Sequence, residues 1–361
     1  MNSGKKYHIG MYGGSFNPLH LGHLECMIKA AGLCDELFVV ISYREDDKGL
    51  PVQDIPVRIK IRWVYQLTKH IGNVHILTLK DRTLRKEDYS EDLWEEDCRI
   101  VKEQIGRPID VVFCGSDYDE NSFWNKCYES ADFVVFPRDQ YNSTAIRSDI
   151  YGHWDWMPQI VRSYFTKKVL LIGGESAGKS TLCINLANYF NTVYLEEVGR
   201  DLSELSGTDT YMLSEDFTRI LLEHKAKEMR LIGQSNKVFF EDTDCLITHF
   251  FMEFLEDPEM EKNGRLADAI AELNSYDLIL FLEPDVAWVQ DGDRSEIIAA
   301  DRLKYSNMIK DYYARHGFQF KVISGDYNSR FDQAVKYVRE RLKKCSKTVN
   351  CLLFKEIESL P

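Results

Sequence analysis

The sequence predicts an α/β protein in which two domains, each built on a doubly wound parallel sheet, follow one another. Short apolar runs alternate with amphipathic helical stretches in both halves of the chain, which is the pattern of βαβ units. The apolar runs are rich in Val, Ile, Leu and Phe with little polar alternation, as in strands buried on both faces of a parallel sheet. The length of 361 residues favours two domains over one.

Each half of the chain contributes a series of candidate strands with helical stretches between them. The segment VRIKIRWVYQLTKH (57–70), for example, has helical periodicity and separates two apolar runs. In the first half we expect strands at 7–13, 37–42, 74–79, 110–115 and 133–136. In the second half we expect strands at 168–174, 192–197, 237–242, 277–283 and 318–324.

The boundary between the domains is predicted within HWDWMPQIVRSYFTKK (153–168), an aromatic-rich amphipathic stretch that precedes a new strand. Trp154 and Trp156 are expected either to pack one domain against the other or to close the first domain. We therefore predict domains over residues 1–165 and 166–345, followed by an unassigned tail at 346–361.

Composition excludes several classes of protein. The net charge of −13 repels nucleic acid, and no local basic patch offsets it. The polar start of the chain leads us to expect neither a signal peptide nor a helix-turn-helix, and the apolar runs are too short to span a bilayer. Nine scattered cysteines without a CxxC pair are typical of buried thiols in a reducing cytoplasm, and their spacing predicts no structural zinc site.

The middle of the chain contains a phosphate-binding loop. GGESAGKS fits G-x-x-x-x-G-K-[ST], follows the apolar run KVLLI and opens a helical stretch. Backbone N–H groups of such a loop surround phosphates, Lys179 neutralises their charge, and the Ser180 hydroxyl reaches Mg²⁺. The alternative is a surface glycine turn with an exposed lysine. The candidate binding residues are Gly173, Gly174, Glu175, Ser176, Ala177, Gly178, Lys179, Ser180 and Thr181.

Acidic residues follow two strands of the second half. KVFFEDTD places Asp242, with Asp244 behind it, where a carboxylate organises a metal ion. TVYLEEVGRD supplies Glu197, which can accept a proton from an acceptor hydroxyl, and Arg200, which can hold a phosphate. The catalytic base is Glu197 or Asp242, with Asp242 favoured for the metal. Each acid alone is equally compatible with an ordinary solvated strand end.

A candidate lid lies further along, at AWVQDGDRS (287–295). Trp288 anchors this loop, and Arg294 can stabilise charge on a transferred phosphoryl group. The alternative is an exposed Asp-Gly turn. With about 180 residues, this half has the size of a small-molecule kinase domain.

The first strand-to-helix turn carries a second phosphate-binding motif. The stretch GGSFNPLHLGH contains Gly13, Gly14, Ser15 and Phe16, followed by His20 and His23. The two histidines are three residues apart at the start of a helix, so their N–H groups can stabilise charge that develops on one α-phosphate. Metal ligation is the rival role for a histidine pair, but no further ligand is spaced for it locally.

This loop resembles that of the HxGH nucleotidyltransferase superfamily. In that family a second motif, [ST]-T-x-x-R, holds the β- and γ-phosphates, and NSTAIR matches it here with Ser143, Thr144 and Arg147. DVVFCGSDYDE resembles the ribose- and nucleotide-contacting site of nicotinamide-mononucleotide adenylyltransferases. Its matching residues are Gly115, Ser116 and Asp117, and Trp124 nearby either stacks on a heterocycle or packs in the core.

The two halves together resemble the bacterial family of bifunctional nicotinamide-mononucleotide adenylyltransferase/ribosylnicotinamide kinases, over roughly residues 5 to 345. The resemblance implies that the second domain phosphorylates nicotinamide riboside with ATP. The first domain then joins the resulting nicotinamide mononucleotide to AMP, giving NAD and pyrophosphate, with Mg²⁺ bridging phosphates in both steps. It implies neither a nucleic-acid nor a membrane partner, and it is compatible with a homo-oligomer.

This chain departs from the family pattern in three places. We expect no helix-turn-helix of the kind that three-domain relatives carry, the acidic cluster reads EDTD, and Asp293 replaces an apolar residue in the candidate lid. The acidic cluster and the lid thus leave open which acid is the base and how the lid packs. Two other hypotheses for the function also stay open. One is a different HxGH nucleotidyltransferase–kinase fusion, such as an enzyme of a coenzyme A precursor, and the other is a nucleotide-sensing regulator.

Overall fold

The computed structural model describes residues 5–44, 55–82, 90–115, 127–137, 140–206, 211–290 and 294–343. The chain forms two compact units, Met1–Val161 and Arg162–Pro361, and each is described by itself. The tail at 346–361 lies outside the described residues.

The first unit is built on a five-stranded parallel sheet in the order β3-β2-β1-β4-β5. The chain runs outward from β1 in one direction and then returns to the other side of β1. Ligands bind at such a switch point, beyond the carboxyl ends of the strands. The strands are β1 (Tyr7–Gly14), β2 (Cys34–Tyr43), β3 (Val74–Lys80), β4 (Val111–Gly115) and β5 (Asp132–Phe136).

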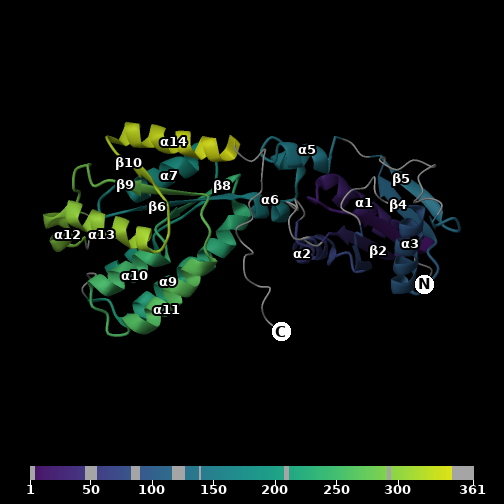
Figure 1. Ribbon diagram of the computed structural model, residues 1–361, viewed down its shortest axis with the longest axis horizontal. Coiled ribbons are helices and arrows are strands. Elements are labelled where there is room, and N and C mark those ends of the chain that lie inside the picture. The colour runs from purple at the N-terminus through teal and green to yellow at the C-terminus, as the bar shows by residue number, and fades with distance from the viewer. Residues whose placement is uncertain are drawn as a thin grey trace. The chain divides into compact units, whose positions relative to one another are not determined.

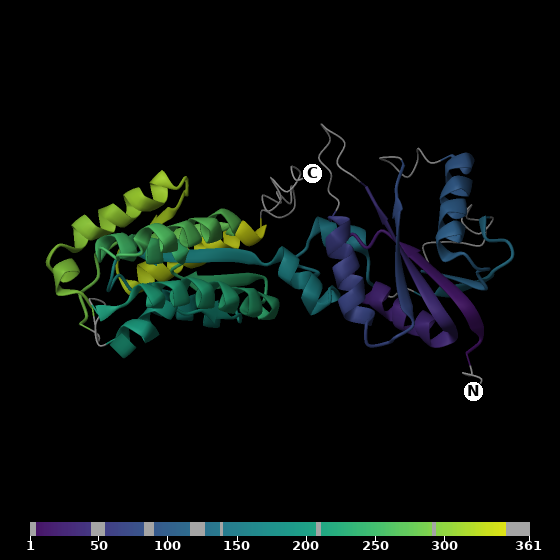
Figure 2. The same ribbon diagram turned by 90° about the horizontal axis from the view of Figure 1, so that it is seen from below.

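Helices cover both faces of this sheet. Figure 2 shows α3 (Glu91–Ile105) on one side of the strands and α1 (Leu21–Leu33) and α2 (Val57–Thr68) on the other. The α3 face is closed by a buried apolar cluster that includes Met11, Val101 and Val112. After β5 the chain continues through α5 (Ser143–Ser148), a short 3-10 turn η2 (Trp154–Trp156) and α6 (Gln159–Phe165), and the boundary between the two units falls within α6.

The second unit is built on another five-stranded parallel sheet, in the order β10-β9-β6-β8-β7. The strand order again reverses beside the first strand of the unit, β6, so that the segment after β6 lies at a switch point. The predicted fold class is confirmed in both units. The strands are β6 (Lys167–Gly173), β7 (Tyr194–Leu195), β8 (Val238–Asp242), β9 (Leu278–Leu282) and β10 (Lys321–Ile323).

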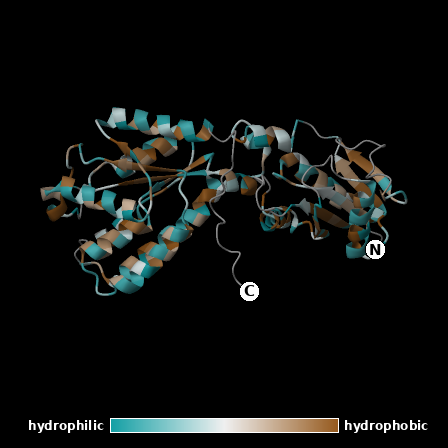
Figure 3. Ribbon diagram, in the orientation of Figure 1, coloured by the Kyte–Doolittle hydropathy of each residue, from teal (hydrophilic) through white to brown (hydrophobic). Residues whose placement is uncertain are grey.

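Alternate residues of the central strands enter two separate cores in this unit. Val169 and Leu171 pack with α7 (Lys179–Tyr189) and α14 (Tyr327–Lys343), whereas Leu170 and Ile172 pack with the helices of the opposite face. Figure 1 shows this layering, and Figure 3 shows that the strands between the layers are hydrophobic. The opposite face carries α9 (Ser214–Leu231), α10 (Cys245–Phe254), α11 (Met260–Leu273) and α13 (Arg302–Arg315). The remaining elements are α8 (Val198–Ser206), η4 (Ile232–Gln234) and α12 (Glu296–Ala300).

Two further predictions concern side chains outside the sites. Trp154 is buried against Tyr151, with ring centroids 5.8 Å apart, and Trp156 contacts Tyr141, so both tryptophans pack within the first unit.

The seven cysteines that the structure describes are free thiols, and most of them are buried. Among the helices of the described ranges, none has the length and hydropathy of a membrane span.

Candidate active sites

The first site is built by His20 and His23 at the start of α1. The backbone N–H of His23 donates to Nδ1 of His20, and the backbone N–H of His20 donates to Nδ1 of His23, both at 3.3 Å. The two imidazoles cap the helix reciprocally and stack with ring centroids 3.6 Å apart. Both side chains are buried.

This capping fixes the tautomer of each histidine. Because each Nδ1 accepts a hydrogen bond, the proton of each neutral ring resides on Nε2. Each Nε2–H is then a donor at the other end of its ring. The pair thus has the form that was predicted to stabilise charge on a phosphate.

Two residues of the loop hold these rings in place. Phe16 is fully buried with a positive φ of 47°, and its ring meets that of His23 edge-on at 5.0 Å. Gly22 leaves little room between the histidines, since a Cβ at that position would lie 3.3 Å from the His20 ring and 3.2 Å from Tyr141. Ser15 is exposed, and Gly13 and Gly14 end β1.

The second motif of this unit lies against the same loop. The Ser143 hydroxyl donates to the carbonyl of Pro18 at 3.1 Å, and the Arg147 guanidinium donates to the carbonyl of Asn17. Arg147 also donates to the Thr144 hydroxyl at 3.0 Å. Gly115 ends β4, the strand that pairs with β1. Ser116, Asp117 and Trp124 lie outside the described residues.

The second site begins with the glycine-rich loop after β6. Gly173 has a φ of 149°, and a Cβ there would lie 2.7 Å from the carbonyl oxygen of Leu282, so only glycine fits. Gly178 is left-handed and starts α7, while Lys179 Nζ donates to the carbonyl of Gly174 at 3.1 Å. The strand, loop and helix thus follow one another as the motif requires.

Three polar side chains gather beside the start of α7. Asp242 ends β8, is 2% exposed, and lies within hydrogen-bonding reach of the Ser180 side chain. Arg200 donates to the Ser180 hydroxyl at 3.0 Å and lies 3.6 Å from the Glu197 carboxylate. Burial, and next the charge of Glu197, raises the pKa of Asp242. Its buried Oδ1 has no hydrogen-bond partner among the described residues.

The neighbouring acids of the EDTD stretch have structural roles. Glu241 points to the opposite face of β8 from Asp242 and pairs with the buried Lys168 at 3.2 Å. Asp244 caps α10, accepting from Leu246 N at 3.0 Å and from the hydroxyls of Tyr276 and Tyr313. Since these contacts use both of its oxygens, the structure gives Asp244 a capping role, and its predicted contact with nucleotide has no further support.

The candidate lid is fastened to the phosphate loop. Arg294 donates to the Ser176 hydroxyl at 3.3 Å, the Val289 N–H donates to the same hydroxyl at 2.9 Å, and Ser295 N donates to Glu175 at 3.0 Å. Trp288 lies under the Arg302 guanidinium, 5.5 Å from its ring centroid. Residues 291–293, including Asp293, lie outside the described residues.

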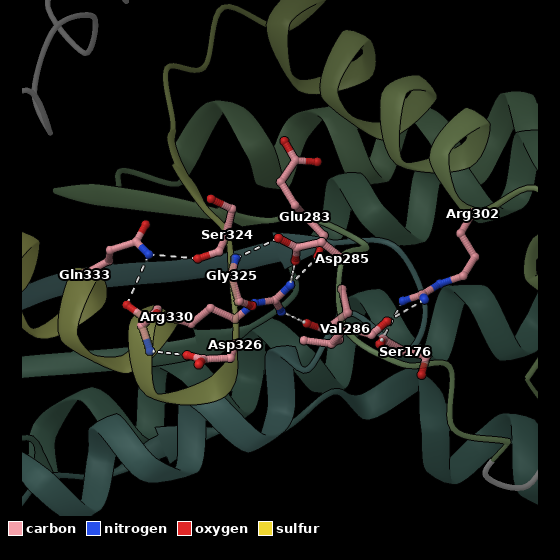
Figure 4. Close-up of polar contacts among 12 residues, drawn as sticks. Ser176, Glu283, Asp285, Val286, Arg302, Ser324, Gly325, Asp326, Arg330 and Gln333 are labelled. Carbon is pink, nitrogen blue, oxygen red and sulfur yellow. Dashed lines mark hydrogen bonds and ion pairs between the residues drawn. The ribbon is translucent and has the colours of Figure 1, made fainter.

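Arg330, which sequence reasoning missed, joins the phosphate loop to the ends of two strands. Its side chain is fully buried and donates to the carbonyls of Ala177, Glu283 and Gly325 and to the carboxylate of Asp285. Figure 4 shows these contacts and also Arg302, which donates to the carbonyl of Ser176 at 3.2 Å. Without the guanidinium, these buried carbonyl groups would have no hydrogen-bond donor from this side chain, so Arg330 satisfies them.

We expect Arg330→Met to destabilise the second unit by about 3 kcal/mol, because the buried carbonyl groups and Asp285 lose their donor. ATP binding to that unit should weaken as well, since the phosphate loop loses the hydrogen bond from Arg330 to the Ala177 carbonyl. Chemical denaturation and nucleotide titration measure the two effects. Arg339→Met, on the same helix, is the matched control because Arg339 is exposed and its hydrogen bond is to the hydroxyl of Tyr189.

A cavity of about 250 Å³ opens beside the phosphate loop. Its polar end is formed by Lys179, Ser180, Thr181, Glu197 and Arg200, and Arg294 also lines it. Its other walls include Phe217, Ile220 and His224 of α9, Ile247 and Phe251 of α10, and the flanking residues Met212 and Leu255. Sequence reasoning missed these walls because apolar residues at helical spacing have the same pattern in a pocket as in a core.

His224 is the polar member of the apolar walls. Burial lowers its pKa to about 4, and its Nε2 has no hydrogen-bond partner among the described residues. The ring is therefore neutral at physiological pH, and protonation of the folded protein is disfavoured.

This shift predicts a pH-dependent stability of the second unit. Between the ordinary pKa of 6.5 and the folded value of about 4, the unfolded chain binds more protons at His224 than the folded chain. The free energy of unfolding should thus fall by about 2 kcal/mol from pH 7 to pH 5. His224→Gln should remove this part of the slope in denaturant titrations at both pH values. An unchanged slope would show that His224 titrates normally.

Comparisons with known proteins agree with this geometry. Residues 11–165 match the cytidylyltransferase-like family, and residues 168–330 match the AAA domain family. The trifunctional NAD biosynthesis/regulator protein NadR of Escherichia coli is 28% identical over 351 residues, which is 94% of this chain and 84% of NadR. This chain is a homologue of NadR. NadR of Salmonella typhimurium is also 28% identical, with the same coverage.

Solved NadR structures share the fold. A crystal structure of NadR in complex with NR matches with a TM-score of 0.75 at 22% identity, covering 94% of this chain and 96% of that one. Phosphopantetheine adenylyltransferase of Streptococcus pneumoniae is 33% identical, but only over 73 residues, which is 20% of this chain and 43% of that enzyme. The similarity to NadR thus extends over both units, whereas the similarity to this Streptococcus pneumoniae enzyme covers a fifth of the chain.

Proposed function

We propose that this protein is a bifunctional transferase of NAD biosynthesis. Its second unit phosphorylates nicotinamide riboside with ATP, and its first unit joins the resulting mononucleotide to AMP from a second ATP, releasing pyrophosphate. One observation carries the proposal: a paired-imidazole site and a phosphate loop occur in one chain, and 94% of that chain aligns with NadR. NadR has been crystallised with NR and with NAD and AMP-PNP.

In the kinase step, the cavity receives the riboside against the apolar walls of α9 and α10 and the phosphate loop receives ATP. Lys179 and Arg200 neutralise phosphate charge, and Arg294 approaches from the lid side. Glu197 lines the cavity and accepts the proton of the attacking hydroxyl, which leaves Asp242 for the metal ion.

Mg²⁺ fits the second site by the chemistry of its donors. The buried, unpartnered oxygen of Asp242 and the hydroxyl of Ser180 are hard oxygen ligands beside the phosphate loop. When bound there, Mg²⁺ would offset negative charge on the phosphates during transfer. In the first unit, the ion is expected to accompany ATP itself.

In the adenylyl step, the reaction needs no covalent intermediate. Nε2–H groups of His20 and His23 donate to the α-phosphate as the mononucleotide attacks, while Ser143, Thr144 and Arg147 hold the β- and γ-phosphates. Gly13 and Gly14 at the end of β1 and Gly115 at the end of β4 lie at the switch point, where we expect the nucleotide to bind. We place both steps in the cytoplasm, where ATP is available.

The direct test supplies the purified protein with nicotinamide riboside, ATP and Mg²⁺ and follows products by chromatography. Nicotinamide mononucleotide should appear first and NAD next, together with one ADP and one pyrophosphate per NAD. Supplied mononucleotide should give NAD without ADP. If neither product forms from the riboside while phosphopantetheine is adenylylated, the coenzyme A alternative replaces this proposal.

A further inference from the structure

A cluster of two histidines and one aspartate lies in the second unit, apart from the residues assigned to the proposed reaction. His249 comes from α10, Asp268 from α11, and His316 from the end of α13. Nδ1 of His249 lies 3.1 Å from Oδ1 of Asp268, and Nε2 of His316 lies 3.9 Å from the same oxygen. One ligand atom from each residue lies within 4.8 Å of the other two.

The second nitrogen of each histidine faces an acceptor. Nδ1 of His316 donates to the carbonyl of Tyr312 at 2.8 Å, so the lone pair of this ring is on Nε2, toward Asp268. Nε2 of His249 lies 3.9 Å from the Glu253 carboxylate. Gly264 leaves room for this side of the ring, since a Cβ there would lie 2.6 Å from Nε2. Metal-binding histidines are oriented in this way, by a carboxylate or carbonyl on the nitrogen opposite the metal.

We infer that His249 Nδ1, His316 Nε2 and the Asp268 carboxylate form a binding site for a divalent transition-metal ion of the zinc class. Two imidazoles and one carboxylate suit zinc better than magnesium, which prefers oxygen ligands only. The metal displaces the proton between His249 and Asp268, and the ring then carries its proton on Nε2, facing Glu253. Water completes the coordination.

The geometry needs only a small contraction around the ion. Metal–nitrogen bonds of about 2.1 Å place neighbouring ligand atoms roughly 3–3.5 Å apart. The Asp268 and His316 side chains are 47% and 32% exposed, so both can adjust toward the more buried His249. The charged groups near Tyr312 at this site include two carboxylates, those of Glu253 and Asp268, and the guanidinium of Arg315. The two negative charges favour a bound cation.

Occupation of this site would join three helices of one sheet face. Figure 1 shows α10, α11 and α13 on the same side of the second sheet. The residues of α10 beside His249, namely Ile247, Thr248 and Phe251, line the cavity next to the phosphate loop. The ion is thus expected to stabilise the second unit and its cavity wall without contacting the reacting groups.

The test is zinc binding to the full-length protein after removal of metals with a chelator. In excess Mg²⁺, which competes for the phosphate-loop site, a chromophoric zinc chelator should report one Zn²⁺ bound per chain. Co²⁺ as a second probe should give a d–d absorption spectrum that contains imidazole ligation. Zn²⁺ should also raise the unfolding temperature of the second unit.

Variants separate this site from adventitious binding. Asp268→Asn and His316→Gln change exposed side chains, so the fold should persist, and each should weaken Zn²⁺ binding at least ~10-fold and abolish the thermal shift. His8→Gln is the matched control, because His8 pairs with Asp35 at 2.7 Å without a second imidazole. Equal Zn²⁺ affinity in wild type and His316→Gln, or no binding in the presence of Mg²⁺, would leave only a hydrogen-bonded ion pair and would overturn the inference.

Discussion

Lys179→Ala is expected to lower phosphorylation of nicotinamide riboside at least ~10³-fold, the largest effect of any single change in the second unit. Lys179 starts α7 at the cavity, and its ammonium group contacts the carbonyl of Gly174 in the phosphate loop. Alanine removes the charge that offsets the phosphates while leaving the glycine-rich backbone intact. Riboside kinase assays with ATP and Mg²⁺ measure the loss.

The same variant should adenylylate supplied nicotinamide mononucleotide at the wild-type rate, because the imidazole pair belongs to the other unit. Lys262→Ala is a suitable control, since Lys262 is a 71% exposed lysine of the second unit that pairs with Glu259. Loss of both activities in folded Lys179→Ala protein would contradict two independent sites.

His23→Ala should have the reverse effect and slow adenylyl transfer by ~10²–10³-fold, the scale for one lost transition-state donor. Riboside phosphorylation should stay unchanged. Since Nδ1 of His23 also accepts the backbone N–H of His20, alanine removes half of the cap of α1, at a cost of about 1 kcal/mol in stability. Rates of NAD formation from mononucleotide, together with thermal unfolding of the variant, measure both effects.

His23→Asn separates the two contributions. Asparagine can accept a hydrogen bond at a helix start but has no imidazole N–H. Its stability should approach that of the wild type while its adenylyl transfer stays low. Recovery of activity with asparagine would mean that His23 acts through the helix cap rather than through a donated hydrogen bond.

Motifs in which backbone conformation and chemistry depend on the same residues could be read from the sequence. The apolar runs predicted both sheets because buried parallel strands leave little polar alternation. The phosphate loop was predictable because only glycine tolerates the conformation and close contact at Gly173. His20 and His23 were predictable because they are neighbours on one helix turn.

Contacts between distant segments were not readable in the same way. Arg330 looks like an ordinary charged residue of an amphipathic helix, and only the folded chain brings it to Ala177, 153 residues away. The sequence EDTD does not show which acid faces the phosphate loop. In the structure, Glu241 and Asp242 lie on opposite faces of β8, and Glu241 pairs with Lys168. His249, Asp268 and His316 share no local motif, since three different helices supply them.

The reciprocal cap at the start of α1 limits which substitutions are tolerated at His20 and His23. Each imidazole secures the other's main chain with the nitrogen that must stay unprotonated, and the same bond directs its remaining proton outward. Protonation of one Nδ1, or replacement of the ring by lysine or arginine, removes a hydrogen-bond acceptor from the first turn of α1. Helix stability alone is therefore satisfied by any side chain that accepts a hydrogen bond at these two positions, whereas the proposed phosphate chemistry requires the imidazoles.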